Sequence, residues 1–215
     1  MFKFGYFILI GNKTEKVRFL RAAVVKGGNI QTPCSRQFMN IFFLDEDPVL
    51  AAQYHCDKHV VKMILESAQL LSTAHRVLDG ELGIRLSASG ARLKDYVLPD
   101  AKQDLLYKAT HISGPCAVWA REASDNYEWL FGLFIALGDE YSYRYNKEHL
   151  SISKLERILA VLPKNIPTKP LTKPPLVMPE GCKDPDPILA YRKYYKTHKS
   201  EIAKWTKRST PDWYK

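Results

Sequence analysis

The chain has 215 residues and a net charge of +9, and its 46% hydrophobic and 26% charged residues exclude a wholly disordered protein. No apolar run reaches the roughly 18 residues that a membrane-spanning helix needs, and FGYFILIG near the start lacks a cleavage motif, so neither a membrane partner nor a signal peptide is expected. The four cysteines are far apart and form no C-x-x-C motif, which favours reduced thiols in a cytoplasmic compartment.

The charge is unevenly distributed along the chain. Residues 1–38 carry seven Lys or Arg and one Glu, and residues 187–215 carry eight Lys or Arg and two acidic residues, so each segment has a net charge of +6. The middle of the chain has a net charge of −3. A basic C-terminal segment on a nearly neutral body indicates an anionic partner, nucleic acid first, although a solvated basic helix is an equal alternative.

The N-terminal segment differs in composition from the rest. Residues 1–38 are poor in acidic residues and end in a loop-like stretch, which predicts an extension or arm that the fold does not need. Residues 40–44 predict a short buried strand, with which residues 5–10 can pair as a second strand. Asp47-Pro48 then predicts a helix start, and one helix or a helix pair is expected from there to about Leu78.

The middle of the chain predicts further helices. Residues 80–98 contain several Gly and Ser and are expected to form a loop, and residues 99–111 a short amphipathic helix. A long helix rich in Trp, Phe, Leu and Ala is predicted over residues 116–146. The S-x-x-E pattern at residues 153–156 is typical of a capping box and predicts a short helix that ends at Pro163.

The last part of the chain predicts an extended segment followed by a helix. Residues 163–187 carry eight of the thirteen prolines, which predicts a strap across the body of the protein. Asp186-Pro187 repeats the helix-start pattern and opens a basic helix expected over residues 187–208. The sequence therefore predicts a mainly α fold, with a single helical domain at residues 39–215.

Residues 55–76 place chemically active side chains along one face of a predicted helix. Apolar residues cover roughly two-thirds of the circumference of this helix, so the face that carries the active side chains is expected to line a cleft. His59 and Glu66 are candidates for general base catalysis, and Lys62 for stabilising negative charge or acting as a nucleophile. The alternative is a set of ion pairs between neighbouring turns, Lys62–Glu66 foremost. The stripe consists of His55, His59, Lys62, Glu66, Gln69, Thr73 and Arg76.

Four zinc-compatible residues raise the question of a metal site. Cys56 and His59 are three residues apart, and His111 and Cys116 are five apart. Cys56 lies about 60° from His59 around a helix, the second pair has no standard spacing, and no H-E-x-x-H motif occurs. Phosphate-binding and dinucleotide-binding glycine motifs are also missing, so no metal and no cofactor is predicted.

Three stretches combine aromatic and basic residues as nucleic-acid-binding segments do. WAREASDNYEWL places the amide of Asn126 inside a helix, where it needs a hydrogen-bond partner. That partner is either the edge of a base or a loop of the protein. EYSYRYNKEH and YRKYYKTHK interleave tyrosines with cations, although half-buried tyrosines and pairing between helical turns explain the first equally well. The candidate nucleic-acid-binding residues are Arg121, Asn126, Arg144, Lys147, His149, Arg192, Lys196, Lys199, Lys204 and Arg208.

Taken together, these motifs show a resemblance that extends over about residues 39–213. The chain resembles a group of largely uncharacterised proteins from tailed-phage genomes. It departs from that group after His111, where a second His-Pro is expected and the chain reads Gly114-Pro115. The matching segments are MNIFFLDEDPVLAAQYHCDKHVVKMILESAQLLSTAHR, LYKATHISGPCAVWARE, NYEWL, EYSYRYNKEH and AYRKYYKTHKSEIAKWTKR.

This group of phage proteins is similar to helical proteins that take part in the hypermodification of thymine in phage DNA. These include the α-glutamyl/putrescinyl-thymine pyrophosphorylases, whose helical cores have been likened to DNA glycosylases. The resemblance implies an enzyme that flips a modified pyrimidine into a pocket and displaces pyrophosphate from it. Lys62, Arg121 or Arg144 would stabilise the leaving group, and His59 or Glu66 would move the proton.

Two alternative functions remain open. In a DNA glycosylase, Glu66 or Asp57 would activate water, or Lys62 would attack the sugar. In a binding protein without catalysis, the same surface would only hold nucleic acid. All three functions imply DNA as partner, duplex or single-stranded, and the cytoplasm of the host cell as the location.

Overall fold

The computed structural model describes residues 39–215, and the predicted arm at residues 1–38 lies outside the described residues. The described part is mostly helical, as predicted, with one short two-stranded antiparallel sheet. Its elements are α1 (Pro48–Tyr54), α2 (Asp57–Asp79), β1 (Glu81–Leu86), β2 (Arg92–Val97), α3 (Lys102–Leu105), α4 (Pro115–Glu122), α5 (Ser124–Tyr145), α6 (Leu150–Leu159) and α7 (Pro187–His198), with short 3-10 turns at Glu180–Cys182, Ser200–Ile202 and Asp212–Tyr214.

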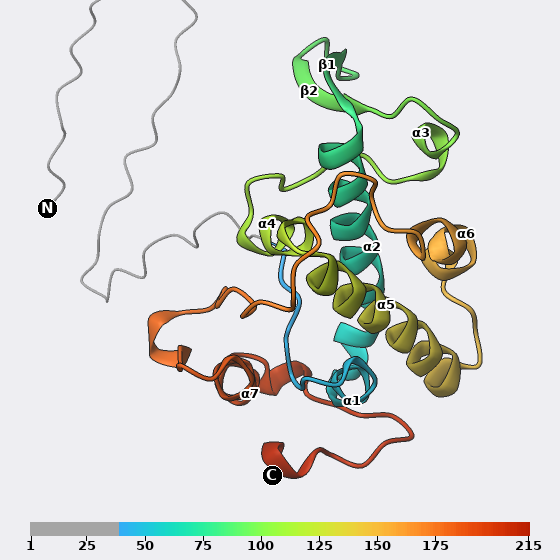
Figure 1. Cartoon of the computed structure of the whole chain (residues 1–215). Coiled ribbons are helices and arrows are strands. Elements are labelled where there is room, and N and C mark those ends of the chain that lie inside the picture. The colour runs from blue at the N-terminus through green and yellow to red at the C-terminus, as the bar shows by residue number, and fades with distance from the viewer. Residues whose placement is uncertain (1–38) are drawn as a thin grey trace, which may run out of the picture. The chain divides into compact units, whose positions relative to one another are not determined.

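Helix α2 forms the centre of the described part. It packs against α4, α5 and α6, and α5 crosses it while also covering α1 (Figure 1). Its apolar residues are buried on several sides, with Met63, Leu70 and Leu71 fully enclosed. The sequence predicts that apolar residues cover most of the circumference of this helix. Contacts with several helices at once explain that wide apolar surface. None of the helices in residues 39–215 is long and apolar enough to cross a membrane.

Two predicted long helices are each divided in two. The expected helix pair before residue 80 is present, because His55 and Cys56 are extended and separate α1 from α2. The predicted helix at residues 116–146 is α4 followed by α5, with Ala123 extended between them. A helix break of this kind leaves the first N–H groups of the next helix without partners inside it.

The proline-rich strap at residues 163–187 is confirmed as an extended segment, and it supplies those partners. The N–H groups of Ser124 and Asp125 donate to the carbonyls of Pro167 and Lys169, at 2.9 and 3.3 Å. The strap thereby caps α5. Figure 1 shows it passing over α4 and α5 before it reaches α7.

Three local predictions need correction. Residues 40–44 are buried but form no strand, since they pair with no strand in the described part and Phe42 has a left-handed backbone conformation. The only sheet of that part is the hairpin of β1 and β2, where the sequence predicted a loop at residues 80–98. Helix α3 has four residues, far fewer than the predicted helix at residues 99–111.

Two helix ends also differ from the prediction. The S-x-x-E pattern at residues 153–156 lies inside α6, whose N-cap is His149, and the His149 side chain accepts from the Ser151 N–H at 3.2 Å. Helix α7 starts at Asp186-Pro187 as predicted, with the Asp186 carboxylate accepting from the Ile188 N–H at 2.8 Å. It ends at His198, so residues 199–208 are a 3-10 turn and an irregular segment rather than helix.

Candidate functional site

His59 lies in the first turn of α2, between the extended segment at residues 39–45 and helix α7. Only 4% of its surface is exposed. A hydrogen bond of 2.5 Å joins its Nδ1 to the hydroxyl of Tyr195 on α7. The ring of Phe42 covers the imidazole, with 4.4 Å between ring centroids and 31° between planes. The imidazole is therefore held by contacts from two segments that are distant in sequence.

Phe42 is itself held in an unusual backbone conformation. Its φ of 47° lies in the left-handed region, which costs a residue of this size roughly 1–3 kcal/mol unless the surroundings impose it. The Asn40 side chain imposes it, because its Oδ1 accepts from the N–H groups of Ile41 and Phe42, at 2.8 and 3.3 Å. The Asn40 amide also donates to the Val177 carbonyl of the strap, at 2.9 Å. Strained residues of this kind concentrate at functional sites.

The imidazole of His59 is neutral at physiological pH. Burial lowers its pKa from 6.5 to about 2, and repulsion from His55 when that ring is protonated, and from the ammonium groups of Lys199 and Lys62, adds to the effect. Burial also raises the pKa of the Tyr195 hydroxyl well above its ordinary value, so the phenol keeps its proton. His59 and Tyr195 thus form a hydrogen-bonded pair of neutral side chains that is shielded from water and has cations nearby.

Two lysines provide those cations. Lys62 is half-exposed, and its ammonium lies 2.9 Å from Glu66, the pair expected between neighbouring turns. The other Glu66 oxygen lies 3.5 Å from the N–H of Asn40. The Lys199 ammonium lies 4.9 Å from the centre of the Tyr194 ring and 6.0 Å from that of Phe42. The structure therefore places Lys62 and Lys199 close enough to His59 to affect its pKa, with Glu66 paired to Lys62, and Lys199 comes from outside the predicted stripe.

The two ends of the predicted stripe serve the fold. His55 Nδ1 lies 2.6 Å from the Ala51 carbonyl in the last turn of α1, which satisfies a helix-end acceptor. Arg76 is fully buried and donates five hydrogen bonds to Gln103 and to carbonyls of the segment at residues 96–107. The stripe is therefore not one continuous face of a cleft, since only its middle part lies near the surface.

Asp57 belongs to a different cluster from the one predicted. Its carboxylate accepts from the N–H and the hydroxyl of Thr206, at 2.9 and 2.7 Å, and from Arg144 at 2.8 Å. Burial raises its pKa, but these hydrogen bonds outweigh burial and hold the pKa below its ordinary value. Residues two apart on a helix point about 200° apart, so Asp57 faces away from His59. Its contacts give it a structural role in place of the predicted catalytic one.

Arg144 connects Asp57 to a second carboxylate. Its side chain is fully buried and donates to Glu140 at 2.6 Å and to the Gln53 carbonyl at 3.0 Å, besides Asp57. Glu140 also accepts a forked pair from Arg208, with a shortest distance of 2.8 Å. Burial raises the pKa of Glu140, but hydrogen bonds from Arg208 and Arg144 bring it below its ordinary value.

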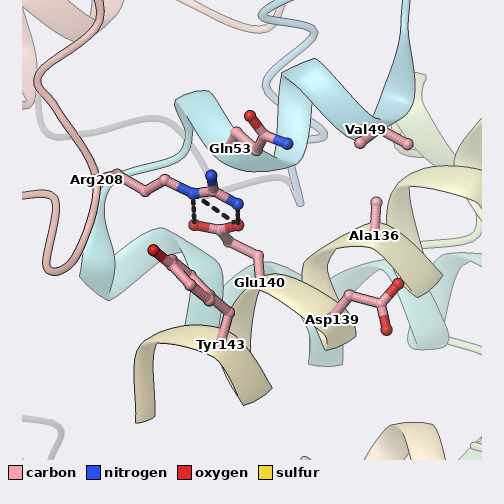
Figure 2. Close-up of a pocket in the computed structure, with 7 residues that line it drawn as sticks. All are labelled: Val49, Gln53, Ala136, Asp139, Glu140, Tyr143 and Arg208. Carbon is pink, nitrogen blue, oxygen red and sulfur yellow. Dashed lines mark hydrogen bonds and ion pairs between the residues drawn. The ribbon is translucent and has the colours of Figure 1, made fainter.

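Glu140 and Arg208 line a small hollow of about 190 Å³ between α1, α5 and the C-terminal segment. Figure 2 shows the Arg208 guanidinium directly against the Glu140 carboxylate, whereas Asp139 points away from that pair. The structure accounts for Arg144 without DNA, because its side chain is fully buried and its donors are used inside the protein. Arg208 is different: its side chain is 34% exposed, and its Nε and Nη2 groups bond to Glu140 while its Nη1 group bonds to none of the described residues.

The other predicted nucleic-acid contacts divide into used and free side chains. Asn126 is fully buried and bonds to the Trp119 carbonyl and to Thr172 of the strap, which makes it a loop-capping amide. Arg121 donates to the Ala117 carbonyl of its own helix at 2.7 Å. His149 caps α6. These three side chains therefore have partners within the fold.

The basic C-terminal segment keeps several exposed cations. Arg192 is the exception, because it donates to the Leu44 carbonyl and to Asp45, both at 3.0 Å. Its guanidinium also lies 5.3 Å from the Trp213 ring centre. The exposed or half-exposed lysines among the predicted contacts are Lys147, Lys196, Lys199 and Lys204.

The four zinc-compatible residues do not form a metal site in the structure. Across residues 39–215, no group of three or more His, Cys, Asp or Glu side chains is placed to hold a metal ion. Cys56 and Cys116 are free and buried, whereas His111 is exposed in a loop. Burial raises the pKa of the Cys116 thiol to about 12, which keeps it protonated and unreactive.

Sequence reasoning misses three aromatic members of the site. It places Phe42 in a buried strand, and it treats Tyr194 and Tyr195 only as members of an aromatic and basic run. The YRKYY run on α7 is the only available signal, and it indicates stacking on bases rather than contact with a histidine.

Comparison of the chain with protein-family models, with curated proteins and with solved structures finds no match.

Proposed function

We propose that the protein is an enzyme that acts on a modified pyrimidine base of DNA, with His59 at the reaction centre. The observation that supports this most strongly is the neutral imidazole of His59, fixed by Tyr195 and adjoined by Lys62 and Lys199. The sequence resemblance to phage proteins of thymine hypermodification favours the same reaction. The base would be flipped out of the helix to reach this place.

The proposed reaction displaces pyrophosphate from the 5-methylene group of the base. An incoming amine forms a bond to the methylene carbon while the carbon–oxygen bond breaks, and the electron pair leaves with pyrophosphate. Lys62 and Lys199 stabilise the charge on the leaving group. His59 accepts at Nε2 the proton that the amine loses, in the tautomer whose Nδ1–H donates to the Tyr195 hydroxyl. Because bound pyrophosphate offsets the positive charge near His59, it raises the pKa of the imidazole and makes it a better base.

A DNA glycosylase is the second candidate, and one observation bears on it. The Glu66 side chain is 14% exposed on the same helix as His59, and its carboxylate could activate water there. The Asp57 carboxylate is not available to activate water, since both of its oxygens accept hydrogen bonds from Arg144 and Thr206. The third candidate is a phage protein that binds nucleic acid without changing it. The host cytoplasm suits each of these functions, because the buried cysteines at 56, 116 and 182 are free thiols.

One experiment separates the three candidates. The protein is incubated with phage DNA that carries pyrophosphorylated 5-hydroxymethyluracil and with an amine, and the nucleosides are then analysed by mass spectrometry. A new amine-substituted nucleoside supports pyrophosphate displacement. Release of a free base supports a glycosylase, and unchanged DNA that remains bound supports a binding protein. Either of the last two results would overturn the first proposal.

Variants of the proposed base and its partner should reduce the rate without changing DNA binding. His59→Gln removes the proton acceptor and is expected to lower kcat by about 100-fold or more. Tyr195→Phe keeps the packing but releases the imidazole from its hydrogen bond, and a smaller loss of kcat is expected. Rate measurements at saturating DNA check both, with Lys94→Ala on the exposed face of β2 as the control. Full activity in His59→Gln would place the reaction elsewhere.

The exposed lysines of the C-terminal segment should bind DNA phosphates. Lys196→Ala combined with Lys199→Ala is expected to flatten the dependence of log K on log salt, by about 0.9 for each duplex phosphate that is no longer neutralised. Arg192 is left intact, because its contacts with Asp45 and Trp213 hold α7 in place. Titrations at several salt concentrations measure the slope. An unchanged slope would mean that these two lysines do not contact DNA phosphates.

A further inference from the structure

A second hollow lies where the N-terminal end of α2 meets the C-terminal end of α5. Its volume is about 350 Å³, and the residues that line it are Asp57, Lys58, Val61, Tyr141, Tyr145 and Lys147. Ligand pockets in proteins range from roughly 300 to 1,000 Å³. The hollow therefore has room for one small ligand, and it is separate from the Glu140–Arg208 hollow of Figure 2.

Two tyrosines supply the aromatic surface of this hollow. The ring centroids of Tyr141 and Tyr145 lie 5.0 Å apart with 50° between the planes, so the rings form a notch rather than a closed stack. The edge of the His149 ring contacts Tyr141, with 5.4 Å between centroids. The Tyr145 hydroxyl lies 3.4 Å from the Asp57 carbonyl at the start of α2. These contacts fix the tyrosines before any ligand arrives.

Two lysines supply positive charge at the same place. Lys58 and Lys147 are both exposed. None of the ion pairs formed within residues 39–215 uses either ammonium group. The one carboxylate of the hollow, that of Asp57, is neutralised by Arg144. The hollow therefore combines apolar aromatic faces with two cations that have no anionic partner in the described part of the chain.

We propose that this hollow binds one unstacked nucleotide of single-stranded DNA. The base stacks on a tyrosine ring, and Lys58 and Lys147 contact the phosphates on its two sides. Aromatic rings beside lysines suit a nucleotide, since a base has an apolar face and its phosphates are anionic. Base-paired DNA presents no free base face and is excluded.

This site lies on a different side of α2 from His59, because Asp57 and His59 point about 200° apart. The inference rests on the proposed function, because it takes DNA as the substrate. It adds the form of that DNA, which is a strand with an unstacked base. It does not depend on catalysis at His59. A strand held here would have one nucleotide fixed while another is processed at His59.

Fluorescence anisotropy with a labelled single-stranded oligothymidylate tests the proposal. Tyr141→Ala is expected to weaken binding by about 5- to 100-fold, the range for loss of one base–aromatic stack. Tyr141→Phe keeps the ring and should bind like the unchanged protein. Lys147→Ala should flatten the salt dependence by about 0.7, the value for one phosphate contact with a single strand. Lys154→Ala, an exposed lysine on α6, is the matched control.

Photocrosslinking locates the bound base. An oligonucleotide with 5-iodouracil is expected to crosslink to Tyr141 or Tyr145, identified by mass spectrometry of the peptides. Crosslinks elsewhere, together with unchanged affinity in Tyr141→Ala and Lys147→Ala, would overturn the proposal for this hollow. Failure of the unchanged protein to bind the oligonucleotide would also overturn it.

The His59→Gln variant separates this inference from the proposed function. If the hollow binds a nucleotide but His59 is not the reaction centre, His59→Gln retains both oligonucleotide binding and any base conversion. If His59 is the reaction centre and the hollow is empty, the Tyr141 and Lys147 variants bind normally while His59→Gln loses conversion.

Discussion

Lowering the pH from 7 to 5 is expected to destabilise the protein strongly, because three buried histidines must be neutral in the folded state. Burial lowers the pKa of His55 and of His75 from 6.5 to about 4, and that of His59 to about 2. Below pH 6.5 the unfolded chain therefore binds up to three more protons than the folded protein. The free energy of unfolding is then expected to fall by as much as roughly 4 kcal/mol per pH unit.

The sign and range of this effect follow from the three pKa values. The stabilisation is fully present above pH 6.5 and is lost as the pH falls; for His55 and His75 the loss is complete near pH 4. Asp57 and Glu140, whose pKa values lie below the ordinary range, lose their contribution only in more acidic solution. Domains are typically stable by about 5–15 kcal/mol, so unfolding is expected between about pH 4 and 5.

Urea unfolding at a series of pH values measures this dependence. His75→Gln removes one titrating group, and the slope below pH 6.5 should become shallower by the equivalent of one proton. A free energy of unfolding that stays constant between pH 7 and 5 would show that these histidines are not held neutral in the folded protein.

Arg144→Met is expected to be among the most destabilising single substitutions. It leaves Asp57 and Glu140 buried without the guanidinium that now pairs with both, and removal of one partner from a buried ion pair costs about 3–5 kcal/mol. Arg208 still pairs with Glu140, so the loss of the Arg144 guanidinium affects Asp57 more than Glu140. Because Asp57 also binds Thr206, the C-terminal segment should loosen from α2.

Chemical unfolding measures the loss, and Arg157→Met provides the matched control. Arg157 is exposed on α6, and its substitution should change the free energy of unfolding by less than about 0.5 kcal/mol. Equal effects of the two substitutions would mean that the network of Arg144 adds nothing to stability.

The parts of the fold that could be predicted from sequence are those set by local chemistry. Asp47-Pro48 and Asp186-Pro187 start α1 and α7 because the cap needs only neighbouring residues. A helix pair before Leu78 was one of two predicted forms, but the position of its break at Cys56, and the break at Ala123, could not be predicted, since the N–H groups after them donate to the carbonyls of Lys204 and Pro167 far along the chain. Tertiary hydrogen bonds decide where those helices start.

The hairpin was missed although a signal was present. Leu82, Ile84 and Leu86 alternate with other residues, as in a strand, and Gly90 with a φ of 79° allows the turn. These three apolar side chains are about 60% exposed in the structure, so the alternation does not mark a buried face. The Gly and Ser residues around them favoured a loop.

For the candidate site, the sequence could indicate one helix but not its partners. The spacing of His59, Lys62 and Glu66 placed them near one another, and the Lys62–Glu66 contact is present. Tyr195 is 136 residues from His59, so only the fold brings its hydroxyl to the imidazole. The same spacing suggested that Arg76 is functional, whereas the fold uses it to hold the segment at residues 96–107.

NMR titration of isotope-labelled histidines with and without pyrophosphate tests the proposed reaction centre most directly. Without ligand, His59 should stay neutral at every pH at which the protein is folded. With pyrophosphate between Lys62 and Lys199, its pKa should rise, while that of His75, buried beside Tyr127, should not change. A His59 signal that titrates near 6.5 in the free protein, or one that pyrophosphate leaves unchanged, would contradict a reaction centre at this histidine.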